Sequence, residues 1–179
     1  MIQNRREFIA RLAAGTALLA TPFELIFSGC SAPPPRTIRI RKVDSNFERE
    51  PLIRPFGFKG GYMSEIWQSA SYLESDSGLH SIGICTQSVL WSDARVFASH
   101  SESGGNALMY AMTERAMQIL EGQSFTSPVE ILDPLYEEVY EYGRKITSNP
   151  ELRKTFALNA LVGVDNAAWL LYAKENNIT

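Results

Sequence analysis

The sequence predicts an α+β domain, and three observations lead to this class. In the first half of the chain, polar and β-branched residues alternate as they do in half-buried strands. The second half carries apolar residues at the three- and four-residue spacings of amphipathic helices. With 179 residues, of which 45% are hydrophobic, the chain is long enough for one domain with its own core. Strands and helices in separate blocks indicate helices packed on one face of an antiparallel sheet.

Three strands are expected, joined as an antiparallel meander. The first covers residues 37–43, where polar and β-branched residues alternate, and the second covers residues 63–73. The third is short, at residues 80–84. Residues 75–78, Ser-Asp-Ser-Gly, are typical of the tight turn that would join the last two strands.

Two stretches are expected to be irregular. Residues 47–61 are interrupted by prolines and glycines, and residues 86–105 are rich in serine. Binding surfaces are often built on such segments, which makes their aromatic and basic side chains candidates for substrate binding. The alternative is that the aromatic residues simply cover the sheet. The candidate binding residues are Phe56, Phe58, Lys59 and Trp91.

Three or four helices are expected after the strands. Asn106 is the predicted N-cap of a helix that ends at Gly122. Residues 127–130, Ser-Pro-Val-Glu, form a capping box with proline at the first helical position. Pro134 is expected to kink the helix that follows or to divide it in two. The last helix is expected to start at residues 149–151.

Composition and charge exclude several classes of function. The chain has 17 Lys and Arg against 20 Asp and Glu, a formal net charge of −3. Nucleic-acid binding requires a basic surface that displaces counterions, so no nucleic-acid partner is expected. The 2 cysteines and 2 histidines are too few for a Cys/His metal cluster or a disulfide framework.

Residues 1–29 are predicted to be an export signal. Arg5 and Arg6 resemble the twin-arginine motif, and a weakly apolar stretch follows them. The alternative is a membrane-spanning anchor. Pro22 and Glu24 restrict the apolar run to about ten residues, short of the roughly 20 that a spanning helix needs.

The end of this signal predicts a lipid anchor. Ser28, Gly29 and Cys30 resemble the end of a lipoprotein cleavage box, so Cys30 is the expected site of lipidation. Residues 30–36 include consecutive prolines that would form a stiff tether to the domain. The expected location is the periplasm or an outer surface, with the membrane contacted only through the signal or its lipid.

No self-contained catalytic set is found in the sequence. His100 and Glu102 could be two metal ligands, but no third ligand lies nearby in the sequence. Ser88 or Ser92 could be combined with Asp93 and His100 as a triad, although no nucleophile elbow surrounds either serine. A complete small enzyme built on this serine- and histidine-containing segment is the least favoured hypothesis.

The last helix carries a motif that is typical of one family. The matching positions are Val164, Asp165, Ala167, Trp169, Leu171 and Lys174. With these residues the helix resembles the closing helix of the N-terminal capping domain in the enolase superfamily, and the mandelate racemase, muconate lactonizing enzyme and dipeptide epimerase branch in particular. The order of strands, loops and helices also fits, so the resemblance covers residues 37–179. Gly163 and Leu170 depart from the usual motif, which has Ala or Ser and a second Asp there.

The resemblance implies a role for the two irregular stretches. In the family, two loops of the capping domain close over the active site and help to select the substrate. They correspond here to about residues 45–61 and 86–105. Lys59 would pair with the carboxylate of a small-molecule substrate. The side chains that would shape this lid are Phe56, Phe58 and Trp91.

The resemblance places the chemistry outside this chain. In the family a separate (β/α) barrel carries a lysine base and three acidic ligands for Mg²⁺, which stabilises an enediolate. Such a barrel needs about 200 residues or more, and the chain ends at Thr179, where the barrel would begin. No catalytic or metal-binding residue is therefore expected here, and Mg²⁺ is implied only for the barrel. Neither the substrate nor the choice between racemisation and elimination follows from the sequence.

Two hypotheses of function result. In the first, the chain is the exported capping part of a racemase-, epimerase- or lyase-like enzyme, inactive alone and completed by a barrel in cis or in trans. In the second, it is a free-standing, lipid-anchored, non-catalytic binding module with the same fold. The first predicts exposed apolar surface where the barrel docks, and hence self-association into homo-oligomers or aggregates. The second predicts a cooperatively folded monomer.

Overall fold

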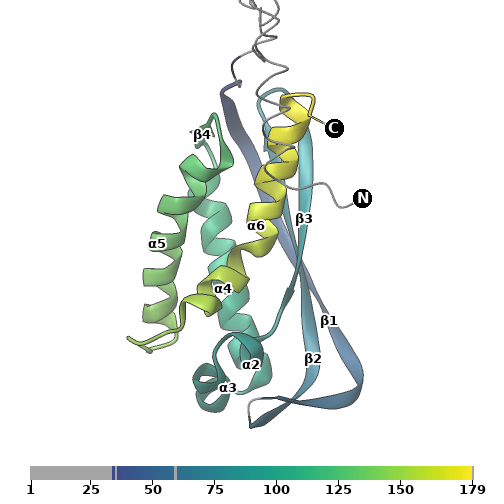
Figure 1. The fold of residues 1–179 in the computed structure, drawn as a ribbon, viewed down its shortest axis with the longest axis vertical. Helices are drawn as coiled ribbons and strands as arrows, with labels where there is room; N and C mark the ends of the chain where they lie inside the picture. The colour runs from purple at the N-terminus through teal and green to yellow at the C-terminus, as the bar shows by residue number, and fades with distance from the viewer. Residues whose placement is uncertain (1–33, 35, 59, 179) are drawn as a thin grey trace, which may run out of the picture. The chain divides into compact units, whose positions relative to one another are not determined.

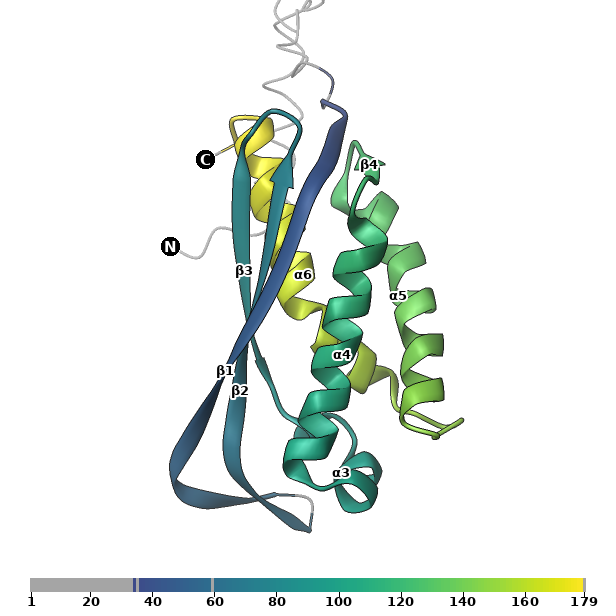
Figure 2. The same ribbon diagram turned by 180° about the vertical axis from the view of Figure 1, so that it is seen from behind.

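The computed structural model describes residues 34, 36–58 and 60–178 (Figure 1). These residues form an antiparallel sheet with helices packed on one of its faces, as two opposite views show (Figures 1 and 2). The predicted α+β class is confirmed. Arg5, Arg6 and Cys30, which carry the predicted export signal and lipid attachment, lie outside the described residues and remain predictions from the sequence.

The sheet has four strands instead of the three that the sequence predicts. The first three form the expected meander, and a fourth is added beside the first, so that the spatial order is β3-β2-β1-β4. The added strand pairs only with Ile38 and Arg39. Two residues are too few to show alternation, which is why the pattern of the sequence did not reveal it. The strands are β1 (Ile38–Phe58), β2 (Gly61–Ser75), β3 (His80–Gln87) and β4 (Ser124–Phe125).

The prediction of an irregular loop at residues 47–61 is wrong, because β1 continues through most of it and pairs with β2. Side-chain contacts across the pair stabilise this long hairpin. The Phe47 ring stacks on the Trp67 ring, with centroids 4.3 Å apart and planes 5° apart. The Arg49 guanidinium lies 2.7 Å from the Glu65 carboxylate. Cross-strand aromatic and opposite-charge pairs of this kind favour a regular ladder over a loop.

The prolines of this segment are tolerated because β1 is an edge strand there. Beyond Ile38 and Arg39, no other described strand pairs with its outer side. Its register with β2 shifts between Pro51 and Phe56, which leaves the residues between them out of the ladder. Prolines within sheets are confined to such edges and bulges. At the bulge the Ile53 side chain is fully exposed, at 102%.

Five helices are described, and two of them fall in the second stretch that the sequence predicts to be irregular. Residues 86–105 contain the end of β3, two short helices and the start of a third. The prediction of an irregular loop is therefore wrong here as well. The helices are α2 (Val89–Ser92), α3 (Ala94–His100), α4 (Glu102–Leu120), α5 (Pro128–Ile146) and α6 (Lys154–Glu175).

Helix α4 begins earlier than predicted, and Asn106 is not its N-cap. Ser101, at a φ of 66°, is the N-cap, and its hydroxyl accepts a hydrogen bond from the Gly104 N–H at 3.3 Å. Asn106 is buried one turn further along, where its side-chain oxygen accepts from the Val89 N–H at 2.7 Å. The asparagine therefore caps the start of the neighbouring short helix α2 instead of its own helix.

The other helix boundaries differ less from the prediction. Helix α5 continues through Pro134 as one helix. Its Glu130 carboxylate accepts from the Thr126 N–H at 2.9 Å, one residue before the expected capping partner Ser127. Helix α6 begins at Lys154, after a turn at the position where the sequence predicts its start.

Helix α6 lies against the sheet along β3 in both views (Figures 1 and 2). By length and composition alone it could cross a membrane. Its most apolar 18 residues have a mean hydropathy of 1.2, but half of this stretch is buried inside the domain. Its apolar composition is therefore accounted for by the core. The α6 residues in that core include Phe156, Ala160, Val164, Ala168 and Leu171.

Two glycines bring α6 and β3 into backbone contact. A Cβ atom placed on Gly83 would lie 1.9 Å from the Gly163 carbonyl oxygen and 2.4 Å from the Ala167 nitrogen. A Cβ on Gly163 would meet tight contacts but no clash, the nearest being the Ser71 hydroxyl at 3.3 Å, which a shift of a few tenths of an ångström relieves. No side chain fits at Gly83, whereas Gly163, which departs from the family motif, has nearly enough room for one.

Side chains of α6 also hydrogen-bond to the outer edge of β3. In each case a terminal amide or ammonium group donates to a backbone carbonyl oxygen of the strand. These bonds occupy acceptors that a neighbouring strand would otherwise use. The pairs are Asn159 with Thr86 at 3.0 Å, Asn166 with Ile84 at 3.1 Å and Lys174 with His80 at 2.6 Å.

Candidate binding site

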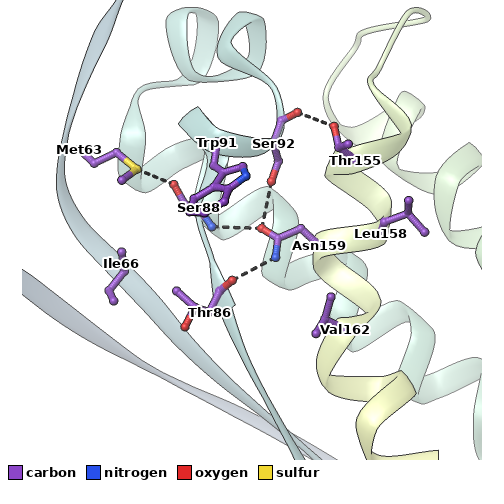
Figure 3. A pocket seen from close by; sticks show the side chains of 10 residues that line it. All are labelled: Met63, Ile66, Thr86, Ser88, Trp91, Ser92, Thr155, Leu158, Asn159 and Val162. Carbon is purple, nitrogen blue, oxygen red and sulfur yellow. Dashed lines mark hydrogen bonds between the residues drawn. The ribbon is translucent and has the colours of Figure 1, made fainter. Parts of the chain in front are cut away.

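A pocket of about 450 Å³ opens between β2, α2 and the first turns of α6 (Figure 3). Its volume lies within the range of small-molecule sites, roughly 300–1,000 Å³. Residues of β2, β3, α2 and α6 supply its wall, so it forms only when these four elements come together. The lining residues are Met63, Ile66, Thr86, Ser88, Trp91, Ser92, Thr155, Leu158, Asn159 and Val162.

Asn159 is the polar centre of this pocket and joins three elements (Figure 3). Its side-chain oxygen accepts from the Ser88 N–H at 3.2 Å and from the Ser92 hydroxyl at 2.9 Å. Its side-chain nitrogen donates to the Thr86 carbonyl oxygen at 3.0 Å. The amide thus fixes the end of β3 and the start of α2 against α6.

The hydroxyl groups around Asn159 also donate within the protein. The Thr155 hydroxyl donates to the Ser92 carbonyl oxygen at 2.7 Å. The Ser88 hydroxyl donates to the Met63 sulfur at 2.9 Å. The hydrogen-bond donors of the wall are therefore engaged before any ligand arrives.

The remainder of the wall and the mouth are apolar. Trp91, which is 68% exposed, lines the pocket at its mouth together with the α6 side chains Leu158 and Val162. Among the described residues that line the pocket, none is charged and none is histidine. The pocket is therefore suited to an uncharged, apolar group.

The predicted binding residues lie in a row that leads to this pocket. The Phe58 ring is 6.2 Å from the Trp91 ring and 6.3 Å from the Phe56 ring, between centroids. Trp91 lines the pocket itself, whereas Phe56 lines an adjoining hollow beside the bulge of β1. Lys59 lies outside the described residues, so its pairing with a carboxylate remains a prediction.

The two segments predicted as lid loops pack against each other. Gly61, at the start of β2, lies so close to α2 and α3 that a Cβ on it would be 3.0 Å from the Phe97 ring and 3.1 Å from Leu90. Nearby, the Ser64 N–H donates to the Glu102 carboxylate at 2.8 Å. The hairpin and the helical segment therefore form one continuous wall beside the pocket.

The residues considered for catalysis do not converge. The Glu102 carboxylate binds Ser64, whereas His100 Nδ1 lies 2.8 Å from the Ser99 hydroxyl. Asp93 is fully buried and accepts hydrogen bonds from the backbone N–H groups of Arg95 and Arg153, both at 3.0 Å. Burial alone would raise the pKa of Asp93, but the hydrogen bonds from Arg153 and Arg95 outweigh it and hold that pKa below its ordinary value. Asp93 therefore joins α3 to the start of α6 as a structural carboxylate.

Cys85 lies behind the pocket and is unsuited to nucleophilic chemistry. Its sulfur is 3.3 Å from the Asn159 carbonyl oxygen and 3.6 Å from the Asn159 side-chain nitrogen. Burial raises the pKa of this thiol. A buried thiol with a raised pKa carries little thiolate and reacts slowly.

The described part of the chain does not fit a magnesium site. No three His, Cys, Asp or Glu side chains come together among the described residues. Mg²⁺ prefers several oxygen ligands, with carboxylates among them. No reaction step is therefore assigned to a metal held by these residues.

A second apolar surface follows the same helix away from the pocket. We call it the edge surface; its outer strand residue Ile84 is 64% exposed, and Trp169 is 43% exposed. A hollow of about 440 Å³ lies between the strand and the helix on this surface. The edge surface consists of Ile82 and Ile84 on β3 and Trp169 and Leu170 on α6.

Several residues of the site were not identified from the sequence. Met63 and Asn159 are the most important, because the Met63 sulfur accepts from the Ser88 hydroxyl and Asn159 is the polar centre. Both lie in regular elements, whereas the predicted binding residues were taken from the two stretches expected to be irregular. The one available signal was that Asn159 interrupts the apolar face of the last helix.

No protein-family model matches the chain, and no curated protein matches it significantly. Among solved structures, the chain is similar to an L-talarate dehydratase from Polaromonas, crystallised with Mg and L-glucarate, at 18% identity and a TM-score of 0.49. It is also similar to a dipeptide epimerase from Enterococcus faecalis, at 18% identity and a TM-score of 0.45. A mandelate racemase/muconate lactonizing protein from Herpetosiphon aurantiacus is similar at 14% identity and a TM-score of 0.43.

These structural neighbours are members of the enolase superfamily, and they are much longer than this chain. The match covers 76% of this chain for the first two and 79% for the third. In each case it covers 32% of the neighbour. At these identities the likeness concerns the fold and says nothing about activity.

Proposed function

We propose that this domain is the substrate-capping part of an enzyme of the enolase superfamily, of the racemase, epimerase or lyase type, and that it works with a (β/α) barrel in cis or in trans. The edge surface is the observation that carries the proposal. A soluble domain rarely leaves a large apolar surface uncovered unless a partner binds there. This surface lies on the closing helix, the element whose sequence resembles the capping domain.

In this proposal the domain encloses the substrate and takes no part in the bond-breaking step. The hairpin of β1 and β2 and the segment from α2 to α3 form the wall, with Phe56, Phe58 and Trp91 along it. The barrel supplies the base and binds Mg²⁺, and the substrate is a small carboxylate. Lys59, which lies outside the described residues, would pair with that carboxylate.

The proposal includes export. Arg5 and Arg6 would direct the chain across the membrane, and a lipid on Cys30 would hold the domain at the periplasmic or outer surface. The barrel would then have to be exported with it. Labelling with a radioactive or clickable fatty acid checks this point, since a Cys30→Ser variant would lose the label.

A second function, a free-standing binding module without catalysis, has one observation in its favour. The core of the domain is continuous, joining Ile40 and Leu73 of the sheet to Phe156 and Leu171 of α6 within these residues alone. The pocket is likewise complete without any other chain. This function requires no barrel, so the two proposals differ in the state of the edge surface.

Sedimentation velocity on the purified full chain, with a dye that binds exposed apolar surface, separates the two functions. The capping function predicts dye binding and concentration-dependent self-association, because the edge surface is uncovered. Trp169→Asp combined with Leu170→Asp should reduce both effects. Ile53→Asp is the matched control, because it removes a fully exposed apolar side chain that lies outside the edge surface.

The double variant at Trp169 and Leu170 and the Ile53→Asp control also test whether a barrel binds to the edge surface. The DNA that follows the last codon, and the neighbouring reading frames, should encode a barrel with a Lys-x-Lys segment and spaced acidic strand ends. Co-purification of that barrel should be lost with the Trp169 and Leu170 double variant and kept with Ile53→Asp. A clean monomer that binds no dye, with no such barrel encoded nearby, would refute the capping function.

A further inference from the structure

We infer that the pocket beside Trp91 binds the apolar, aromatic end of a carboxylate substrate and does not accept polyhydroxylated acids. The inference names the substrate class of the proposed capping function and rests on it for the carboxylate. The pocket itself is complete in this chain, so its selectivity can be measured without a barrel.

The first argument is the engagement of the polar atoms in the wall. Asn159 accepts from Ser88 and Ser92 and donates to Thr86. The Thr155 and Ser88 hydroxyls donate to other protein atoms. The hydroxyl oxygens can still accept, but no donor of these groups is left for a ligand, and most of the wall is apolar. A hydroxyl-rich ligand would therefore lose more hydrogen bonds to water than the wall replaces, which is unfavourable.

The second argument is the absence of charge. No charged side chain is among the described residues that line the pocket. A carboxylate buried there would lose its hydration without gaining an ion pair. The charged end of a ligand must therefore stay outside, and only its uncharged end can enter.

The third argument is the kind of apolar side chain that faces the space. The Trp91 ring lines it together with Leu158 and Val162 of α6, while Met63 supplies a sulfur atom (Figure 3). Aromatic rings pack favourably against indole, and thioether sulfur makes favourable contacts with ring edges. An aromatic group gains more from this wall than an alkyl chain of the same length does.

The aromatic residues at the mouth of the pocket indicate the orientation in which the ligand binds. The row of Phe56, Phe58 and Trp91 leads from the hairpin to the pocket, with neighbouring ring centroids 6.2 to 6.3 Å apart. A ligand that enters along this row places its ring against Trp91 and leaves its carboxylate near the hairpin.

The experiment uses the full chain and two probes, 1-naphthylacetate as an aromatic carboxylate and gluconate as a hydroxylated one. Indole N–H signals in ¹H–¹⁵N NMR spectra report Trp91, Trp169 and Trp67 separately. We expect 1-naphthylacetate to shift the Trp91 signal and the Asn159 side-chain amide signals with saturation. Gluconate at the same concentration should shift neither.

Two variants locate the probe. Trp91→Ala should weaken 1-naphthylacetate binding about tenfold or more, since exposed aromatic anchors dominate such contacts. Trp169→Ala is the matched control, an exposed tryptophan on the edge surface outside the pocket, and it should leave binding unchanged. Circular dichroism of both variants checks that the fold is kept.

Three results would overturn the inference. They are equal binding of gluconate, absence of 1-naphthylacetate binding, and a loss of binding with Trp169→Ala as large as that with Trp91→Ala. The last would mean that the probe sits on the edge surface, where a partner docks. None of these results bears on whether a barrel co-purifies with the chain. The inference about the pocket and the proposed capping function can therefore be refuted separately.

Discussion

Helix α6 meets the sheet in two different ways along its length. Near Gly83 and Gly163 the two backbones touch, and not even a Cβ atom can be added on the strand. Little more than one turn nearer the start of the helix, Asn159 bridges to the sheet and a pocket of about 450 Å³ remains beside it. The same helix thus makes a close-packed contact with β3 at Gly83 and Gly163, which we call the seam, and leaves an open pocket beside Asn159. The size of the residues between helix and strand decides which of the two forms.

The difference shows how the site is supported. The seam fixes the distance and angle of α6, so that Leu158 and Val162 reach the mouth of the pocket in a defined position. The pocket contributes little to that placement, because its mouth residues are exposed. Stability should therefore depend strongly on the seam and weakly on the pocket mouth. Four substitutions test this order, and three of them are paired with a control.

The largest loss of stability is expected at the seam. Gly83→Ala puts a Cβ atom 1.9 Å from the Gly163 carbonyl oxygen, and backbone atoms must move to relieve the clash. The free energy of unfolding should fall by about 3 kcal/mol or more, measured by urea denaturation.

The matched control for the seam is Gly163→Ala. Its nearest new contact would be 3.3 Å, and alanine favours a helix by about 1 kcal/mol over glycine. The change in unfolding free energy should therefore lie within about 1 kcal/mol of zero. Equal losses from the two substitutions would show that the seam is not the tight contact described here.

The next largest loss is expected at the polar centre of the pocket. Asn159→Ala removes the acceptor for Ser88 and Ser92 and leaves buried groups without partners, so unfolding free energy should fall by about 2–3 kcal/mol. Asn166→Ala is the control, since it removes an exposed amide with one bond to Ile84 and should change the value by less than about 1 kcal/mol. A loss no greater for Asn159 than for Asn166 would contradict the bridging role.

A pH-dependent effect is expected at Asp93, beside the pocket. Because hydrogen bonds hold its folded-state pKa below the ordinary value, its carboxylate stabilises the fold above the unfolded-state pKa of about 4. That contribution is lost as the pH falls through the lowered folded-state value. Asp93→Asn should reduce stability by about 1–2 kcal/mol at neutral pH and flatten its decline in acid, in urea titrations at several pH values.

Glu151→Gln provides the comparison for Asp93. Glu151 pairs with the same arginine, Arg95, but its side chain is 81% exposed. Such a surface pair is worth about 0–1 kcal/mol, so the pH profile of stability should hardly change. If Glu151→Gln, and not Asp93→Asn, flattened the decline of stability at low pH, that decline would have to be attributed to Glu151 instead of Asp93.

The smallest effect on stability is expected at the mouth. Trp91→Ala removes a side chain that is 68% exposed, and the free energy of unfolding should change by less than about 1 kcal/mol. The same substitution is expected to impair probe binding. A large loss of stability would mean that Trp91 belongs to the packed part of the fold.

The class of the fold and most of its elements could be predicted from the sequence. The alternation in residues 63–73 and the helical spacing around Phe156 reflect local burial, which a single sequence records directly. The second half of β1, residues 47–58, could not be predicted, because prolines such as Pro51 and Pro55 usually exclude a strand. That they lie on an edge strand, where proline is tolerated, becomes known only when the sheet is known. The Phe47–Trp67 stack that stabilises it joins residues far apart in the sequence.

The candidate site was predicted only in part. Trp91 was identified because it is an aromatic residue in a stretch expected to be irregular, and binding surfaces are often built on such segments. Asn159 was missed because its partners Thr86 and Ser88 come from another element, and no local pattern records that meeting. The importance of Gly83 is likewise invisible in the sequence, since its cause is the helix that crosses it.

The bonds from α6 to the outer edge of β3 have a consequence for how the protein can assemble. Asn159, Asn166 and Lys174 already occupy carbonyl oxygens that a second chain would need in order to extend the sheet. Fibril growth by strand addition at β3 is therefore disfavoured by the protein's own side chains. The edge surface can attract a partner through its apolar side chains while the strand beneath it is protected from ordered aggregation.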